Sequence, residues 1–97
     1  MFRHMVLFRW IEGTTPEQAD AVADALRGLP AAIPEIAGYH CGPDLALSDG
    51  TWDFGLVAEF ADEADWRTYR DHPTHQALIE EYIKPLAAGR AAVQIQG

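Results

Sequence analysis

The segment from Tyr69 to His75, Tyr-Arg-Asp-His-Pro-Thr-His, places one phenol and two imidazoles within seven residues. Histidine ordinarily titrates near neutrality, so its imidazole can take up and release protons under physiological conditions. A tyrosine hydroxyl in a water-poor cavity can stabilise negative charge that develops on an oxygen atom. The segment therefore predicts acid–base chemistry that needs neither a metal nor an organic cofactor.

Two other kinds of site have less support. His72 and His75 have the spacing of a ligand pair, but Pro73 interrupts the helix that would turn both rings to one side. No cluster of carboxylates or thiols completes a metal shell, so we expect no metal. Cys41 is the only cysteine, which excludes an internal disulfide. The adjacent His40 points to the opposite face of the strand, so an inert, buried thiol is expected.

The same histidines also have a structural interpretation. His72 could hydrogen-bond the end of the helix that Pro73 breaks, and His75 could be a core histidine whose hydrogen bonds are satisfied. The two interpretations separate on one point, because catalysis requires His75 and Tyr69 to face a common open cavity.

A strand at the start of the chain carries a further histidine. Apolar residues alternate with period two over residues 2–10, which predicts a strand that is covered on both faces. One face carries Phe2, His4, Val6, Phe8 and Trp10, and the other carries Arg3, Met5, Leu7 and Arg9.

Three helices are predicted from their caps and from the spacing of their apolar residues. Thr15-Pro16-Glu17-Gln18 is a capping box with proline at the first helical position. It begins a helix whose apolar positions include Leu29. Gly28 and Pro30 are the residues expected to terminate this helix. Asp62 caps a second helix, which stops at residues 71–72. Pro73 begins a third helix, which Pro85 should kink or fray. The apolar side of the third helix carries Leu78, Ile79, Tyr82, Ile83 and Leu86.

Three more strands are expected over residues 38–42, 52–60 and 90–96, with a surface loop over residues 43–50. In the second of these, Trp52 should share a face with Phe54. The order strand, helix, strand, strand, helix pair, strand indicates an α+β ferredoxin-like fold, a split βαβ arrangement with a four-stranded antiparallel sheet and helices on one face. The other face carries apolar residues such as Met5, Leu7 and Val57. We expect a second copy to cover them, which gives a homodimer with packed sheets.

Length and charge limit the function classes. The 97 residues fit a single domain over residues 1–97. A formal net charge of −8 repels phosphate backbones, which argues against nucleic acid as a partner. No apolar run has the length of a membrane span, and no signal peptide is evident. We therefore expect no membrane association and a cytoplasmic location.

Three segments together resemble the Dabb family of dimeric stress-responsive α/β-barrel proteins. They are Arg3-His4-Met5-Val6-Leu7-Phe8, the passage Leu29 to Pro34, and the segment Tyr69 to His75. The resemblance implies a dimeric barrel. It also implies that, as in a plant branch that closes polyketide chains by aldol condensation, Tyr69 and His75 form a catalytic pair while His4 lines the pocket.

The remaining expectations concern the pocket and its use. A lining from strands one and three and from the helices would be apolar and would favour an acyl chain or a flat aromatic ring. Its expected residues, besides His4, are Val6, Phe8, Val22, Leu26, Leu56, Leu78 and Leu86. Val22, Ala23 and Leu26 stand where the cyclase branch carries aromatic residues, so the same substrate is not implied.

Two functions of different class follow. The first is a cofactor-free lyase or cyclase acting on a β-keto or polyketide-like substrate, with His75 as base and Tyr69 as polar anchor. The second is a non-catalytic dimer with a ligand-binding or stress-related structural role. A cofactor-free monooxygenase is a third hypothesis, which rests on fold analogy alone.

Overall fold

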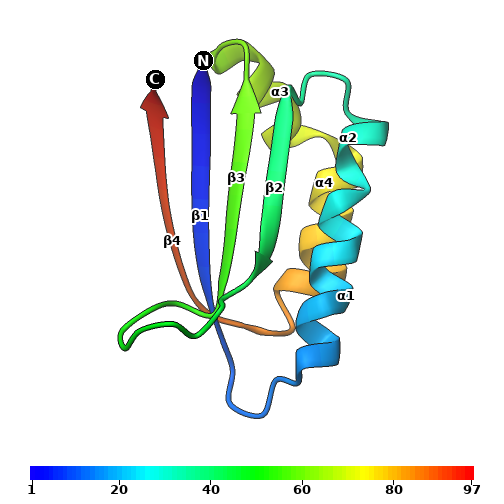
Figure 1. Ribbon diagram of the computed structural model, residues 1–97. Coiled ribbons are helices and arrows are strands. Elements are labelled where there is room, and N and C mark those ends of the chain that lie inside the picture. Colours follow the sequence, from blue (N-terminus) through cyan, green and yellow to red (C-terminus); the bar gives the residue numbers. More distant parts are fainter.

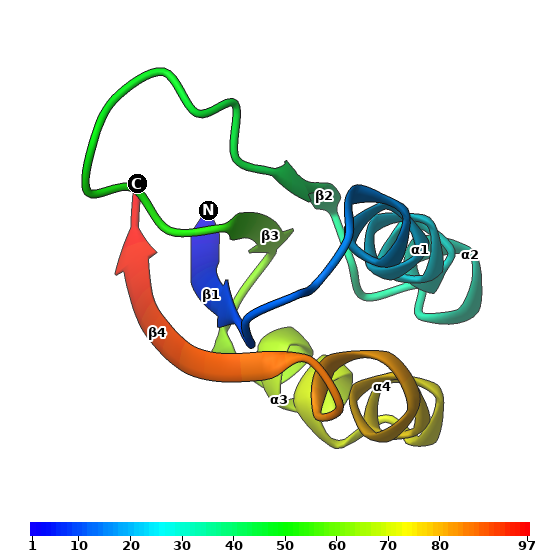
Figure 2. The ribbon, with the colours of Figure 1, turned by 90° about the horizontal axis from the view of Figure 1, so that it is seen from below.

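Four strands form one antiparallel sheet in the order β2-β3-β1-β4, and all helices lie on one of its faces (Figures 1 and 2). The computed structural model describes residues 1–97. The strands are β1 (Phe2–Trp10), β2 (Gly38–Pro43), β3 (Phe54–Phe60) and β4 (Ala87–Gln96). The helices are α1 (Pro16–Arg27), α2 (Leu29–Ala32), α3 (Glu63–Asp71), α4 (Pro73–Leu78) and the π-helical turn η1 (Ile79–Ile83). The predicted ferredoxin-like fold is confirmed.

The central strand β1 has the predicted alternation. Phe2, His4, Val6 and Phe8 are buried toward the helices. Pairing on both sides aligns His4 with Ala58 of β3 and with Gln94 of β4. The register therefore fixes which side chains of the two neighbouring strands stand next to His4 on the inner face.

The helix starts follow the predicted caps. The Thr15 hydroxyl accepts from the Gln18 amide at 3.2 Å, and the Gln18 side chain accepts from the Thr15 amide at 2.8 Å. Asp62 likewise accepts from the Asp65 amide at 2.9 Å. Each cap satisfies amides that the first turn of a helix leaves without partners.

Several predicted boundaries were wrong, although β2 differs from its prediction only by the addition of Pro43. Helix α1 ends at Arg27, because the Gly28 amide donates to the Ala25 carbonyl and so closes the last turn. Leu29 instead begins the short helix α2. Strand β3 begins at Phe54, and Trp52 lies under the Arg9 guanidinium on the outer face rather than beside Phe54. Strand β4 begins at Ala87, ahead of the expected residue 90, because β1 pairs with it as far as Trp10.

The expected kink near Pro85 takes the form of a widened turn. The Lys84 amide donates to the Ile79 carbonyl at 2.9 Å, a five-residue step instead of the four-residue step of an α-helix. Pro85 follows directly and has no amide hydrogen to continue the helix. The turn directs Ile79 and Ile83 toward the sheet, where Ile83 is buried.

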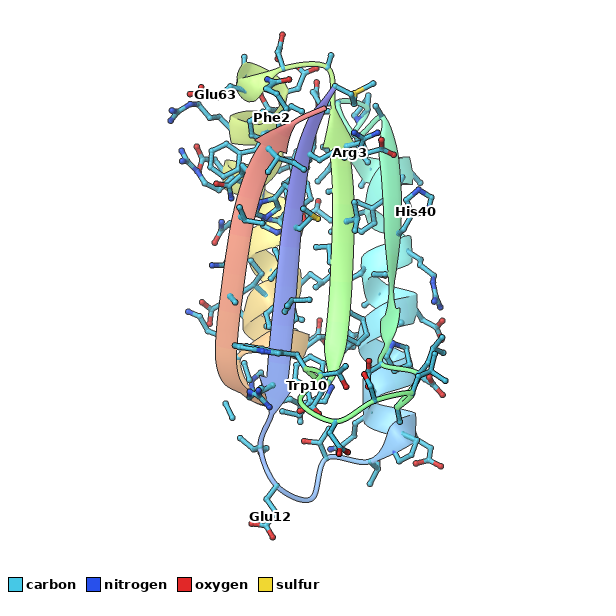
Figure 3. The ribbon with its side chains drawn as sticks, turned by 60° about the vertical axis from the view of Figure 1, so that its left-hand side comes forward. Phe2, Arg3, Trp10, Glu12, His40 and Glu63 are labelled. Carbon is cyan, nitrogen blue, oxygen red and sulfur yellow. The ribbon has the colours of Figure 1, made fainter.

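No helix covers the outer face of the sheet (Figure 3). This face carries Leu7, 43% exposed, Val93, 50% exposed, and Ile95, 43% exposed. Met5, Leu7, Ala91 and Val93 line a shallow, wholly apolar hollow there. None of the helices combines the length and the apolar character that crossing a bilayer would require.

Candidate functional site

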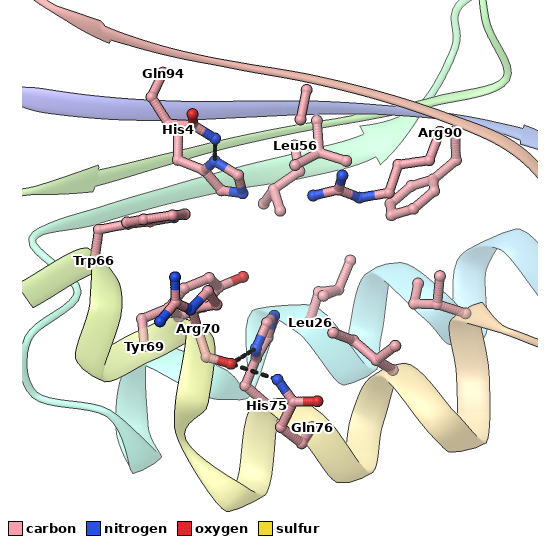
Figure 4. A pocket seen from close by; sticks show the side chains of 15 residues that line it. His4, Leu26, Leu56, Trp66, Tyr69, Arg70, His75, Gln76, Arg90 and Gln94 are labelled. Atoms are coloured by element: carbon pink, nitrogen blue, oxygen red, sulfur yellow. Dashed lines mark hydrogen bonds between the residues drawn. The ribbon is translucent and has the colours of Figure 1, made fainter. Parts of the chain in front are cut away.

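A cavity of about 390 Å³ lies between the inner face of the sheet and the helices (Figure 4). The sheet wall comes from β1 and β4 together with Leu56 of β3, and the opposite wall comes from α3, α4 and η1 with Leu26 of α1. Its volume falls in the range of small-molecule sites. Phe8 and Leu26 line this space and leave it open.

The cavity wall includes both members of the predicted catalytic pair and five of the eight residues expected to bind substrate. These five are His4, Val6, Phe8, Leu26 and Leu56. Three expected residues are not part of the wall. Val22 and Leu78 are buried in the core, and Leu86 packs against that core from the end of the helical region.

Eight lining residues were not foreseen. They are Trp66, Arg70, Gln76, Ile79, Ile83, Arg90, Ala92 and Gln94. Arg90, Ala92 and Gln94 occupy every second position of β4, opposite in phase to the apolar set Ala91, Val93 and Ile95. Their alternation was therefore visible in the sequence, although nothing there related this face of β4 to the histidines.

His75 and Tyr69 lie side by side at the junction of α3 and α4. Their ring centroids are 4.1 Å apart. Pro73 separates the two helices, and His72 caps α4 by accepting from the Thr74 amide at 3.1 Å. The break turns α4 so that His75 comes back over the last turn of α3. His72 thus has the structural role that the sequence allowed.

The hydrogen bond of His75 determines which ring nitrogen is free. Its Nδ1 lies 3.1 Å from the Arg70 carbonyl oxygen, which can only accept, so Nδ1 carries the proton. Nε2 then has a free lone pair, and the ring lies in the cavity wall (Figure 4). Burial lowers the pKa of His75 below its usual 6.5, although the bond to Arg70 opposes that shift. The neutral, proton-accepting form therefore dominates at pH 7.

The Tyr69 hydroxyl is held by a second tyrosine. It lies 2.8 Å from the Tyr39 hydroxyl, which comes from β2. Burial raises the pKa of Tyr69 to about 12, and the hydrogen bond with Tyr39 opposes that rise. Tyr69 is 2% exposed and keeps its proton across the neutral range. It is therefore placed as a hydrogen-bond donor or acceptor, and not as a phenolate.

His4 has the opposite proton arrangement to His75. The Gln94 side-chain amide donates to His4 Nδ1 at 2.8 Å, so the neutral ring carries its proton on Nε2. His4 is 5% exposed, and burial, with smaller contributions from the charges of Arg90 and His75, lowers its pKa to about 4. Across the cavity from the basic nitrogen of His75, His4 thus offers an N–H donor (Figure 4).

The other candidate groups stand apart from this arrangement. His40 lies on β2, 3.8 Å from a Glu59 carboxylate oxygen, and is not part of the cavity wall. The Cys41 thiol is half-buried and not fully buried as expected. Burial still raises its pKa, so it is a weak nucleophile. No group of three or more His, Cys, Asp or Glu residues is placed to hold a metal ion.

The family model described as the stress responsive A/B barrel domain, Dabb, matches residues 2–96. The chain belongs to the Dabb family. A dimeric ferredoxin-like protein of unknown function from Thermobifida fusca is 46% identical to this Dabb chain, with a TM-score of 0.90 over 99% of this chain and 90% of that one.

Two further relatives of this Dabb protein differ in what is known of them. An uncharacterized protein of Streptomyces coelicolor is 28% identical over 81 residues, which is 81% of this chain and 84% of the relative. Hydroxynitrile lyase from Passiflora edulis is 18% identical, with a TM-score of 0.83 over 97% of this chain and 90% of that one, a likeness of fold.

Proposed function

We propose that this Dabb protein is a cofactor-free acid–base enzyme, a lyase or cyclase that removes a proton next to a carbonyl group. The observation that carries the proposal is the hydrogen bond from His75 Nδ1 to the Arg70 carbonyl. It leaves the basic Nε2 free in an open cavity, beside a protonated tyrosine. A base and a hydrogen-bond donor that face the same cavity are what enolate formation requires.

The steps follow from the two histidine tautomers. His75 Nε2 takes a proton from the carbon next to a carbonyl, and the electron pair of that C–H bond moves into an enolate. Tyr69 or the N–H of His4 donates to the enolate oxygen. In a β-keto or polyketide-like chain, the enolate carbon then attacks a second carbonyl carbon. The resulting alkoxide takes back the proton from His75, so the reaction closes a ring with no net change in protons.

The active assembly is a homodimer joined through the outer faces of two sheets. The apolar hollow around Leu7 and Val93 supports this, because a free apolar face of that kind is what a second sheet covers. The related protein from Thermobifida fusca is described as dimeric. This interface lies on the face of the sheet opposite the cavity, so each copy would keep its own site.

Exchange of carbon-bound hydrogen for deuterium tests the proton abstraction directly. In D₂O, 4-phenylbutan-2-one exchanges its protons slowly, and proton NMR follows their loss. We expect the protein to accelerate the exchange and His75→Gln to reduce the acceleration by about a hundredfold or more, the usual contribution of a general base. The glutamine amide can still donate to the Arg70 carbonyl, so the local fold is kept. His40→Gln, outside the cavity, is the matched control.

The pH profile gives a second readout. The base acts only when neutral, so exchange should persist at neutral pH and be lost as the pH falls through the lowered pKa of His75, below 6.5. Equal exchange by the wild type and His75→Gln would refute the catalytic role. It would favour the second candidate function, a non-catalytic ligand-binding dimer, for which the open cavity is the supporting observation.

A further inference from the structure

One cationic side chain of the cavity has no part in the proposed proton transfer. Arg90 lies on β4 directly opposite Phe8 of β1, and its guanidinium points into the cavity from the sheet wall (Figure 4). Tyr69 and His75 stand on the facing wall of helices. A molecule that spans the cavity therefore meets Arg90 at one side and the acid–base pair at the other.

Arg90 is also the only basic side chain without a partner. The chain has seven Lys and Arg residues. Five of them form ion pairs with Asp or Glu, and Arg9 lies over the Trp52 ring. The Arg90 side chain has no ion pair, no hydrogen bond and no aromatic ring beneath it, although the chain contains 15 acidic residues. A guanidinium with five free donors in a site is the group that binds a carboxylate through two parallel hydrogen bonds.

The surroundings keep that charge available to a ligand. No Asp or Glu is among the residues that line the cavity. The second arginine of the wall, Arg70, is paired with Asp71 at 2.8 Å. In a protein with a formal net charge of −8, the cavity is thus a local positive site. The electrostatic influence of Arg90 reaches both histidines, because its charge adds to the effect of burial in lowering the pKa of His4 and His75.

We propose that the ligand of this cavity is a carboxylate with an apolar body, and that Arg90 binds the carboxylate while the body lies among Val6, Phe8 and Leu26. The inference rests on the proposed function in using the same cavity, and it narrows the substrate class to acids. Arg90 is a binding residue that sets specificity and takes no proton. A bound carboxylate would also offset the charge of Arg90 and raise the pKa of His75, which makes the base stronger once substrate is present.

Calorimetric titration with two probes of equal shape tests this assignment. The probes are 4-phenylbutanoate and its neutral counterpart 4-phenylbutanamide. We expect the wild type to bind the carboxylate about tenfold more tightly, as for a charge-assisted hydrogen bond at a site open to water. Arg90→Gln should remove this preference and leave the amide Kd within about twofold. Arg27→Gln, which deletes the same charge on α1 outside the cavity, should retain it.

The outcomes separate this inference from the catalytic one. His75→Gln should keep the carboxylate preference, so a failure of the exchange experiment leaves this result standing. Equal binding of the two probes, binding of neither probe, or equal weakening of both by Arg90→Gln would overturn the inference. If Arg90→Gln does not fold, the salt dependence of the wild type decides, because the carboxylate advantage must shrink between low and high salt.

Discussion

Removing the buried imidazole of His4 should reduce the loss of unfolding free energy that occurs as the pH falls. In the folded protein the pKa of His4 is about 4, against the ordinary 6.5 expected for the unfolded chain. As the pH falls from 6.5 to 4, the unfolded chain takes up a proton that the folded protein excludes. The stabilising contribution is therefore complete above pH 6.5 and is lost progressively as the pH falls to 4.

The size of this loss follows from linkage. A difference of that size corresponds to about 3 kcal/mol over the whole range and about 2 kcal/mol between pH 7 and pH 5. A domain of this length has a total stability of about 5–15 kcal/mol, so the effect is a large fraction of the whole. The pKa of His75 is lowered as well, so His75 also makes the folded protein lose stability as the pH falls.

Urea unfolding followed by circular dichroism from pH 8 to pH 4.5, at one protein concentration, measures the effect. We expect the free energy of unfolding of the wild type to fall by about 2 kcal/mol more than that of His4→Gln between pH 7 and pH 5. His40→Gln removes an exposed imidazole and should follow the wild type. Parallel curves for the wild type and His4→Gln would refute the argument that burial of a neutral His4 costs stability in acid.

Three further changes test other parts of the structure. Tyr69→Phe keeps the ring but leaves the Tyr39 hydroxyl without its partner, and should lower the free energy of unfolding in urea by about 1 kcal/mol; an unchanged value would mean that water replaces the bond. Thr15→Ala breaks the capping box with Gln18 and should cost about 1 kcal/mol in the same assay, whereas no loss would show that α1 is held by packing alone. Val93→Asp places a charge on the outer sheet face and should convert dimers to folded monomers in light scattering; a persisting dimer would argue against the sheet-to-sheet interface.

Local patterns were sufficient to predict most of the fold. The alternation of β1, the capping box at Thr15 and the break at Pro73 each depend on residues close in sequence, and each is found as expected. The errors arose where distant contacts decide. Trp52 turns to the outer face because it meets Arg9, 43 positions away in the chain, and no periodicity within its own segment records that partner.

The residues of the cavity wall were predicted only in part, because distant contacts also decide which side chains reach it. His4, Tyr69 and His75 were identified from residue type and from the family resemblance, and they do line one cavity. Arg90 and Gln94 were missed because their positions depend on the register between β1 and β4, which pairs Arg90 with Phe8 and Gln94 with His4 from opposite ends of the chain. The tautomers of the two histidines depend in turn on Gln94 and on the Arg70 carbonyl, and neither contact has a sequence signature.

Strand β4 forms one wall of the cavity, yet it is an edge strand that pairs with β1 alone. A molecule that touches both this wall and the helices opposite therefore holds the edge of the sheet in place. A ligand present at a hundred times its Kd would add about 2.7 kcal/mol to the stability of the folded state. Occupancy of the cavity and protection of the β4 amides from hydrogen exchange should rise together. A ligand of the kind proposed would therefore also slow the opening of this edge strand.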